Sequence, residues 1–514
     1  MNFEQTFDYI IIGAGAAGCV VTNRLSASAD TSVLVLEAGP SDDSPLIHTR
    51  NYFNGFINTW GTDVDWQLET EEQSGLKGRK IGIIQGKVVG GGSSVHAMMY
   101  VRGDRLDYDH WNFLGNEGWS YEDVLPYFKK SEDYEGGADE YHGAGGGMKG
   151  MKCPDLTPAA YGFLNAAAEL GYKSGPDVDL NAADHSAAGI MQYNFTQDGK
   201  RCSAADGFLT PVLDRPNLTV KTKAEVTRVL FEGTRAVGVE YIQDGATHQV
   251  RAEREVILSA GAFLSPKILM LSGIGPADHL QSHGISVVVD LPGVGQNLQD
   301  HMRLMVAYKS KTELPLPTTV AEVGLFARSR SGMQAASPDL QINFSAGIPG
   351  FVDVAEFPFE GPHSIFVPIL VQAQSRGYVK LRSSNPQDKP VVNPNYLGVE
   401  TDVKAYIRGV EICREMANTQ AFSEFNDGEI CPGAGGNVEE YIRSHATTIW
   451  HPAGSCKMGR DAMAVVDPQL RVYGVEGLRV ADASIMPTVS SGNTNAPSVM
   501  IGEKAADMIL AAKG

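Results

Sequence analysis

Three glycines near the start of the chain, Gly13, Gly15 and Gly18, form a GxGxxG pattern in the stretch GAGAAG. The pattern directly follows the apolar run YIII and opens a stretch with helical spacing, and Glu37 ends the next apolar run. Glycines at this spacing allow a tight turn, close approach to a pyrophosphate and close helix packing, while the acid can accept both ribose hydroxyls. The sequence therefore predicts a dinucleotide site whose contacts are Gly13, Gly15, Ala16, Ala17, Gly18, Glu37 and Ala38. A βαβ unit without a nucleotide is the alternative.

The GxGxxG pattern alone fits both NAD and FAD. A second glycine cluster helps to choose between these two ligands. The stretch GKVVGGGSSVHAMMYVRG, from Gly86 to Gly103, places three glycines and two serines after a basic residue. Such a surface suits a flat ligand that lies against backbone N–H groups. The alternative, a flexible surface loop, is weakened by the apolar residues that follow at once.

One histidine stands in an unusual setting. His451 lies in TTIWHPAGSCKMG, between apolar residues and a Pro-Gly turn. By its local surroundings it is a satisfied core residue. The functional alternative is a general base, since an unperturbed imidazole has a pKa of about 6.5 and is mostly neutral at pH 7. The decision depends on the rest of the chain.

Two domains are expected to position these groups, because 514 residues exceed what one hydrophobic core usually serves. Residues 7–37 predict strand, turn, helix and strand, the opening of a βαβ unit. The alternating residues 217–242 predict an antiparallel meander, and residues 402–419 have helical spacing. The last helix is expected to carry Pro497 in its first turn, where the missing N–H costs nothing.

Composition excludes several classes of protein. A net charge of −19 argues against nucleic acid or an anionic membrane as a partner. The six cysteines are far apart and form no metal-type cluster, so free thiols in a reducing compartment are expected. The first residues run straight into a predicted strand and leave no room for a cleaved leader, and no segment suits a membrane span. A cytoplasmic protein without a transmembrane segment is expected.

Several motifs together resemble the glucose–methanol–choline (GMC) family of flavin-dependent oxidoreductases. In family order they are GAGAAG with Glu37, GKVVGGGSSVH, GAFLSPKILMLSGIG, WHPAGSCKMG and GLRVADASIMPTVSSGNTNAPSVMIGEKAAD. The last is most similar to choline dehydrogenases and related bacterial alcohol dehydrogenases. The resemblance implies an α/β fold, with a Rossmann-like FAD-binding domain (residues 1–155, 205–310 and 445–514). It also implies an α+β substrate-binding domain built on an antiparallel sheet (residues 156–204 and 311–444).

The resemblance also implies roles for individual residues. His451 matches the family's active-site base and Asn493 its partner. Together they would remove the hydroxyl proton of a primary or secondary alcohol while hydride passes to flavin N5. The further cofactor contacts that it implies are Val89, Gly91, Gly92, Ser93, Ser94, His96, Ala97, Val226, Ala260, Trp450, Asp482, Ala483, Asn495 and Ala496. No metal is expected.

One position departs from the family's pattern. The first signature usually ends in Asn, whereas here it ends in His96. Certain relatives attach FAD covalently through a histidine of this loop, and in choline oxidases that histidine comes one position earlier, where this chain has Val95. Non-covalent FAD is therefore expected. The stretch GVGQNLQDH recurs in the family and is interpreted as structural, with His301 as a packing residue.

Three other functions share the fold or the motifs. They are a flavin-containing hydroxynitrile lyase, a fatty-acid photodecarboxylase and a flavoprotein without enzymatic activity. The photodecarboxylase needs a cysteine where this chain has apolar residues around Val371. The alcohol stays open: choline would require a carboxylate and an aromatic cage around its ammonium. The electron acceptor, O2, a quinone or another carrier, also stays open.

Overall fold

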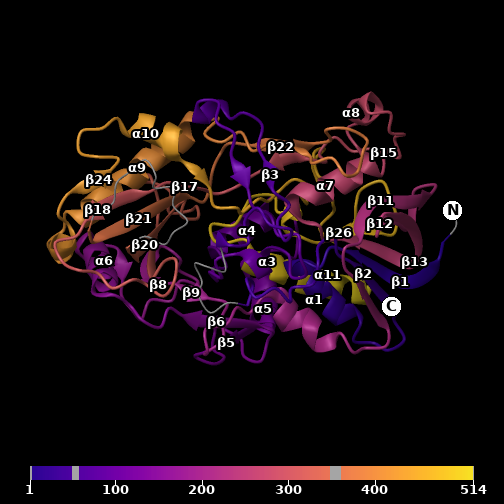
Figure 1. The fold of residues 1–514 in the computed structure, drawn as a ribbon, viewed down its shortest axis with the longest axis horizontal. Coiled ribbons are helices and arrows are strands. Elements are labelled where there is room, and N and C mark those ends of the chain that lie inside the picture. Colours follow the sequence, from indigo (N-terminus) through magenta and orange to yellow (C-terminus); the bar gives the residue numbers. More distant parts are fainter. Residues whose placement is uncertain (1–2, 49–56, 348–360, 513–514) are drawn as a thin grey trace.

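The computed structural model describes residues 3–48, 57–347 and 361–512. Figure 1 shows two β-sheets toward opposite ends of the long axis, with helices and loops between them. The two marked chain ends lie at the same end as the first sheet.

The first sheet has seven strands, in the order β10-β2-β1-β13-β12-β11, with β26 also pairing β13. The strands β10, β2, β1, β13 and β26 run parallel, and β12 and β11 continue antiparallel. The parallel part is built from runs such as YIII and VLVL that are buried on both faces, as parallel sheets require. The bounds are β1 (Gln5–Ile12), β2 (Val33–Leu36), β10 (Leu218–Lys221), β11 (Glu225–Glu232), β12 (Arg235–Gln243), β13 (Ala246–Leu258) and β26 (Leu478–Val480).

The predicted elements of this sheet are confirmed with one correction. Strand, glycine turn, helix α1 (Ala16–Leu25) and strand follow one another as expected. In the predicted meander, however, only β11 and β12 form an antiparallel pair; β10 pairs in parallel with β2. The apolar and polar alternation of residues 217–242 could not distinguish these pairings, because it reports one buried face and not the direction of the neighbouring strand.

Helices from distant parts of the chain pack together beside the first sheet. The last helix, α11 (Asn495–Ala511), contacts both α1 and α5 (Tyr121–Ser131). A side chain at Gly502 of α11 would place its Cβ 2.7 Å from the carbonyl oxygen of Ala17, so the two helices approach to backbone contact. Helix α7 (Gly261–Leu271) contacts β11.

The second sheet has nine strands and is antiparallel except for the pair β7 and β8. Its main order is β24-β18-β21-β20-β19-β8-β7, and the short strands β17 and β25 pair beside β21. The bounds are β7 (Lys173–Ser174), β8 (Ala187–Ile190), β17 (Met302–Arg303), β18 (Val306–Lys309), β19 (Val323–Ala327), β20 (Leu340–Ala346), β21 (His363–Leu370), β24 (Glu429–Cys431) and β25 (Thr447–Thr448).

A second hydrophobic core lies around this sheet. It joins β20 and β21 to α6 (Pro158–Glu169), α9 (Glu400–Ala417) and α10 (Val438–His445), and is separate from the core of the first sheet. The predicted fold class, a Rossmann-like parallel sheet with a second antiparallel sheet, is confirmed. The domain boundaries stay a prediction; β17 and β18, before the predicted break at residue 310, pair within the second sheet.

The remaining elements are shorter and lie outside these two sheets. They are η1 (Ser74–Leu76), β3 (Leu68–Glu69), β4 (Gly82–Ile83), α3 (Gly92–Val95), α4 (Arg105–Phe113), β5 (Glu132–Tyr134), β6 (Met148–Lys152), β9 (Gln192–Tyr193), η2 (Ala205–Leu209), η3 (Thr210–Val212), β14 (Ile274–Gly275), α8 (Ala277–Ser282), β15 (Val289–Asp290), β16 (Gln296–Leu298), β22 (Gly377–Lys380), β23 (Val391–Asn393), η4 (Gln420–Phe425) and η5 (Ala483–Ile485).

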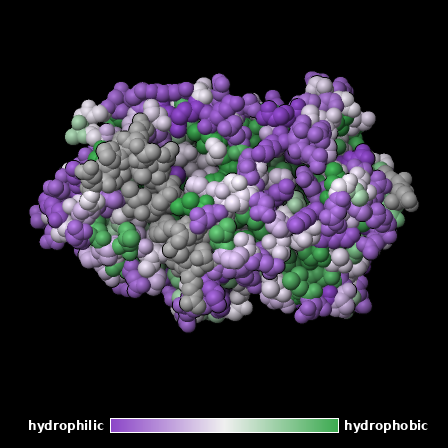
Figure 2. Space-filling model, in the orientation of Figure 1, coloured by the Kyte–Doolittle hydropathy of each residue, from purple (hydrophilic) through white to green (hydrophobic). Residues whose placement is uncertain are grey.

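The surface is largely hydrophilic on the face shown in Figure 2, with smaller hydrophobic areas among the polar ones. This agrees with the net charge of −19. Among the helices of the described residues, none combines the length and the apolar character needed to cross a bilayer.

Candidate active site

One cavity opens where the parallel strands of the first sheet end. Gly13 follows β1, Glu37 follows β2, Ser259 follows β13 and Asp482 follows β26, and all four line this cavity. Parallel strands place their carboxyl ends along one edge, which is where sheets of this type bind ligands. The site predicted from GAGAAG and Glu37 is therefore a single hollow assembled from four separate stretches of chain.

The glycines make the wall of this hollow possible. A Cβ at Gly18 would lie 2.1 Å from the carbonyl oxygen of Gly13, which closes the turn tightly before α1. Gly91, at φ +55°, would place a Cβ 2.7 Å from Cα of Gly15. The two glycine clusters thus touch each other. Because these positions carry no side chains, the backbone N–H groups at the N-terminus of α1 stay accessible to a ligand. Their partial positive charge favours a phosphate group.

Glu37 is held in place by backbone groups. Its Oε2 accepts the N–H of Ala14 and its Oε1 accepts the N–H of Gly39, each at 2.8 Å. Burial raises the pKa of this carboxyl group, while the two N–H groups oppose the rise. Carboxylate oxygens have further lone pairs, so the side chain can still accept hydroxyl groups of a ribose.

Most predicted site residues line this cavity. They are Gly13, Gly15, Ala16, Ala17, Glu37, Ala38, Gly91, Gly92, Ser93, His96, Ala97, Val226, Ala260, Trp450, His451, Asp482, Ala483, Asn493 and Asn495. Four others are not part of the lining: Gly18, Ser94 and Ala496 lie next to lining residues along the chain, and Val89 lies two positions before the lining residue Gly91. The hydroxyl of Ser94 donates to the carbonyl of Val89 at 2.7 Å, and this hydrogen bond fixes the glycine loop.

His96 lines the cavity, and the contacts of one ring nitrogen define its tautomer. Its Nδ1 accepts the backbone N–H of Met98 at 3.0 Å and an N–H of Arg201 at 3.1 Å. Because a guanidinium only donates, Nδ1 carries no proton and the neutral ring holds its proton on Nε2. That Nε2 is buried and has no hydrogen-bond partner within the described residues. Burial, together with the charge of Arg201, lowers the pKa of His96 to about 3.

His451 and Asn493 line the same cavity and contact each other. Nε2 of His451 lies 3.1 Å from Nδ2 of Asn493, and both side chains line the cavity. Burial lowers the pKa of His451 to about 4, so the imidazole is neutral at physiological pH. The structure therefore brings together a neutral base and an amide donor that are 42 residues apart in sequence.

Asp300 holds the backbone of both His301 and His451, a role that the sequence interpretation of GVGQNLQDH missed. Its Oδ1 accepts the backbone N–H of His301 at 2.9 Å and that of His451 at 2.8 Å. Its Oδ2 accepts the hydroxyl of Thr448 at 2.6 Å and that of Tyr396. Burial raises the pKa of Asp300 to about 6.

Two more side chains of the same stretch contact the catalytic segments. Nδ1 of His301 lies 3.0 Å from Nδ1 of His451. Nδ2 of Asn297 donates to the carbonyl groups of Gly454 and Pro487, each at 3.1 Å. The interpretation of His301 as a packing residue overlooked its contact with the proposed base, because no local pattern reports a partner 150 residues away.

The second sheet supplies the opposite wall. Asn343 of β20 and Val367 of β21 line the cavity together with Met99, Val320 and Ile449. Their side chains are apolar except for the amide of Asn343. The proposed base thus lies between a dinucleotide-type cleft and a mostly apolar surface.

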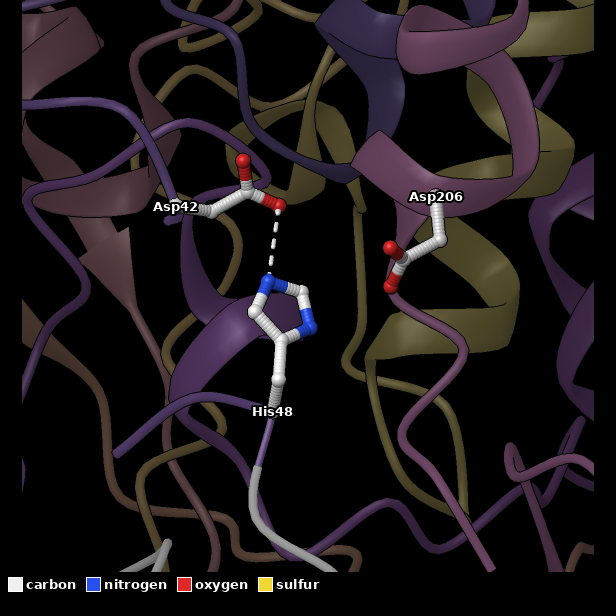
Figure 3. Close-up of side chains that lie close together, drawn as sticks. All are labelled: Asp42, His48 and Asp206. Carbon is white, nitrogen blue, oxygen red and sulfur yellow. Dashed lines mark ion pairs between the residues drawn. The ribbon is translucent and has the colours of Figure 1, made fainter. Parts of the chain in front are cut away.

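A separate cluster offers atoms that could hold a cation. One ligand atom each of Asp42, His48 and Asp206 lies within 4.8 Å of the others (Figure 3). Nε2 of His48 lies 3.9 Å from Oδ2 of Asp42, and the side chains are 38% and 14% exposed. Asp206 already accepts the N–H and hydroxyl of Ser203, each at 2.8 Å. A partly exposed ion pair accounts for this cluster, and the expectation of no metal stays a prediction.

Comparison with known proteins agrees with this architecture. Family models described as GMC oxidoreductase match residues 7–303 and 373–502. The mitochondrial choline dehydrogenase of Mus musculus is 41% identical, over 98% of this chain and 90% of that protein. The oxygen-dependent choline dehydrogenase of Brucella canis is 39% identical, over 98% and 95%. The crystal structure of pyridoxine 4-oxidase from Mesorbium loti superposes with a TM-score of 0.90 at 31% identity, covering 98% of each chain.

The chain belongs to the GMC oxidoreductase family. It is an FAD-dependent oxidoreductase of the alcohol-oxidising type. The cavity fits the cofactor on its own evidence. The glycine clusters leave room against backbone, Glu37 and the N-terminus of α1 suit a ribose and a pyrophosphate, and His96 Nε2 is a buried donor that needs an acceptor.

Proposed function

We propose that this protein oxidises a primary or secondary alcohol to an aldehyde or ketone, with His451 as the base. FAD, when bound, supplies the acceptor for the hydride that leaves the carbinol carbon. The observation that carries the proposal is the 3.1 Å contact between His451 Nε2 and Asn493 Nδ2 on the cavity wall. A substrate hydroxyl that replaces this contact and lies beside both atoms can give its proton to His451 Nε2 and accept a hydrogen bond from the Asn493 amide.

Each residue has a distinct task in this reaction. The carbinol carbon releases a hydride readily only as negative charge develops on its oxygen. Nε2 of neutral His451 takes the hydroxyl proton, and the Asn493 amide N–H stabilises the charge on oxygen. The residues proposed to hold FAD are the cofactor contacts predicted from the sequence, of which Gly13 is the first and Ala496 the last. Among them, Glu37 would bind the ribose, and His96 and Asn495 would lie near the flavin.

The proposal is tested by mixing the purified FAD-containing protein with a panel of alcohols without oxygen. Bleaching of the flavin absorbance by an alcohol supports oxidation and argues against the hydroxynitrile lyase, whose acid–base chemistry leaves the flavin oxidised. His451→Ala should slow bleaching by about 10²- to 10⁴-fold while FAD remains bound. The matched control is His110→Ala, an exposed histidine on α4 that should bleach at the wild-type rate. Bleaching of His451→Ala at the wild-type rate would refute the base assignment.

Two finer points also stay proposals. The reduced flavin passes its electrons to O2, a quinone or another carrier, and the rate of reoxidation in air separates the first from the others. The cytoplasmic location is kept as a prediction; all six cysteines are buried free thiols, in keeping with a reducing compartment.

A further inference from the structure

The two tryptophans that line the cavity, Trp66 and Trp450, each already bind a cation of the protein. Nζ of Lys87 lies over the Trp66 ring, 4.5 Å from its centroid. The guanidinium of Arg303 lies over the Trp450 ring, 5.7 Å from its centroid. A ring face attracts a cation through its quadrupole. The ring faces that Lys87 and Arg303 already occupy are not available to bind the cation of a substrate.

Arg303 also sets the charge next to the proposed base. It belongs to β17 and is 8% exposed, and Trp450 directly precedes His451 in the chain. Burial lowers the pKa of Arg303 to about 10, so the guanidinium remains charged at neutral pH. Buried charges are weakly screened by salt. A cationic substrate that reaches His451 therefore approaches the like charge of Arg303 behind Trp450, whereas the carboxylate of Asp300 beside His451 is already occupied by two backbone N–H groups and two hydroxyls.

The lining of the cavity also contains carboxylates. Among the described residues its lining includes Glu37, Glu225 and Asp482. Glu37 follows β2, Glu225 begins β11 and Asp482 follows β26, so all three belong to the first sheet. Oδ2 of Asp482 accepts the N–H of Gly261 at 2.9 Å and the hydroxyl of Ser265 at 2.6 Å. Among the described residues, the lining carboxylates thus lie on the dinucleotide side, whereas the lining residues that β20 and β21 contribute, Asn343 and Val367, are uncharged.

We infer that the substrate is an uncharged alcohol with an apolar body, and that the site discriminates against a quaternary ammonium alcohol such as choline. The inference rests on the function proposed above and names the substrate class of the same site. Two relatives at 39–41% identity are named choline dehydrogenases, so the distinction separates this chain from them. The apolar body contacts Met99, Val320 and Val367, and the amide of Asn343 can meet one polar group.

The test uses two alcohols of the same shape. Choline and 3,3-dimethylbutan-1-ol differ in having nitrogen or carbon at the branched centre, and so differ in one positive charge. The anaerobic rate of flavin bleaching is measured against concentration for each. We expect the ratio of the rate constant to the dissociation constant to be at least about tenfold higher for the neutral alcohol, because the charge of Arg303 repels choline and not its neutral counterpart. An equal or higher ratio for choline would overturn the inference.

Variants of Arg303 test the assigned cause. Arg303→Met removes the charge at similar length, whereas Arg303→Lys keeps it. The preference for the neutral alcohol should shrink by about tenfold in Arg303→Met and persist in Arg303→Lys. Because both alcohols are compared within one variant, damage to folding or to FAD binding cancels. An unchanged preference in Arg303→Met would contradict the role of this side chain.

A binding measurement keeps the two proposals apart. Each alcohol is titrated into the oxidised protein in air-free buffer, and the shift of the flavin absorbance reports binding without turnover. If no alcohol of the panel bleaches the flavin, the proposed function fails, while tighter binding of the neutral alcohol still supports the inferred class. If alcohols bleach the flavin but choline binds as tightly as its neutral counterpart, the function stands and the inferred class fails.

Discussion

Nδ1 of His301 lies 3.0 Å from Nδ1 of His451, on the side of the ring away from Asn493. The amide nitrogen of Asn493 can only donate, so His451 Nε2 is the acceptor of that contact. The proton of the neutral His451 ring is therefore on Nδ1, where it is donated to His301. His301 thus selects the tautomer in which Nε2 faces the substrate as a base.

Removal of His301 should leave the base without a fixed tautomer. We expect His301→Ala to lower the anaerobic rate of flavin reduction by about 10- to 100-fold, the usual effect of a partner that orients a functional imidazole. His301→Gln, whose amide oxygen can accept the same proton, should recover part of the rate. Stopped-flow absorbance measures both. In the His451→Ala background the same change should have no further effect; an additive loss would show that His301 acts independently of the base.

The low pKa of His451 predicts a broad pH range for the chemical step. The base must be unprotonated, and burial lowers its pKa to about 4. The rate of flavin reduction should therefore be nearly constant between pH 5.5 and 8 and decline only as the pH falls toward about 4. An unperturbed imidazole, with a pKa of about 6.5, would instead lose about tenfold at pH 5.5. Single-turnover reduction across this range distinguishes the two outcomes.

The first sheet could be predicted in outline because its signals are local. The run YIII, the glycine turn and Glu37 lie within one βαβ unit, and the structure places Gly13 and Glu37 on one cavity. The pairing of β10 with β2 could not be predicted, since these strands are far apart in sequence and alternation carries no direction. Whether two strands so far apart in sequence pair with each other depends on the fold of the whole chain.

The candidate site was only partly accessible from the sequence. His451 and Asn493 were found through the family resemblance, because nothing in WHPAG alone distinguishes a base from a core histidine. Asp300 was missed because its effect arises from two backbone N–H groups, one of them 151 residues away. Arg201 was missed for the same reason: its contact with His96 joins residues 105 positions apart.

Asp300 should be more important for the position of the base than for its charge. Asp300→Ala removes the acceptor of two backbone N–H groups and two hydroxyls, so we expect the free energy of unfolding to fall by about 2–4 kcal/mol, several times the net value of one hydrogen bond. The rate of flavin reduction should fall as well. Asp300→Asn keeps an oxygen for the N–H groups of His301 and His451, and the hydroxyls can turn to accept from its amide. It should be much milder in both measurements.

Chemical denaturation and stopped-flow reduction of the two Asp300 variants provide the comparison. If Asp300→Asn is as damaging as Asp300→Ala, the carboxylate charge matters more than its geometry, and the proposed positioning role is wrong.

The tautomer of His96 predicts how FAD is held. Arg201 and the N–H of Met98 occupy Nδ1, so Nε2 carries a proton and has no lone pair free to attack the flavin. FAD should therefore appear in the supernatant after acid precipitation of the protein; flavin absorbance that stays with the pellet would refute this. His96→Ala should weaken FAD binding by up to about tenfold, the value of one lost hydrogen bond, and shift the absorbance of the bound flavin. His96→Gln, which can keep a donor at this place, should bind FAD more tightly than His96→Ala. Equal affinities for the two variants would mean that His96 gives the flavin no hydrogen bond.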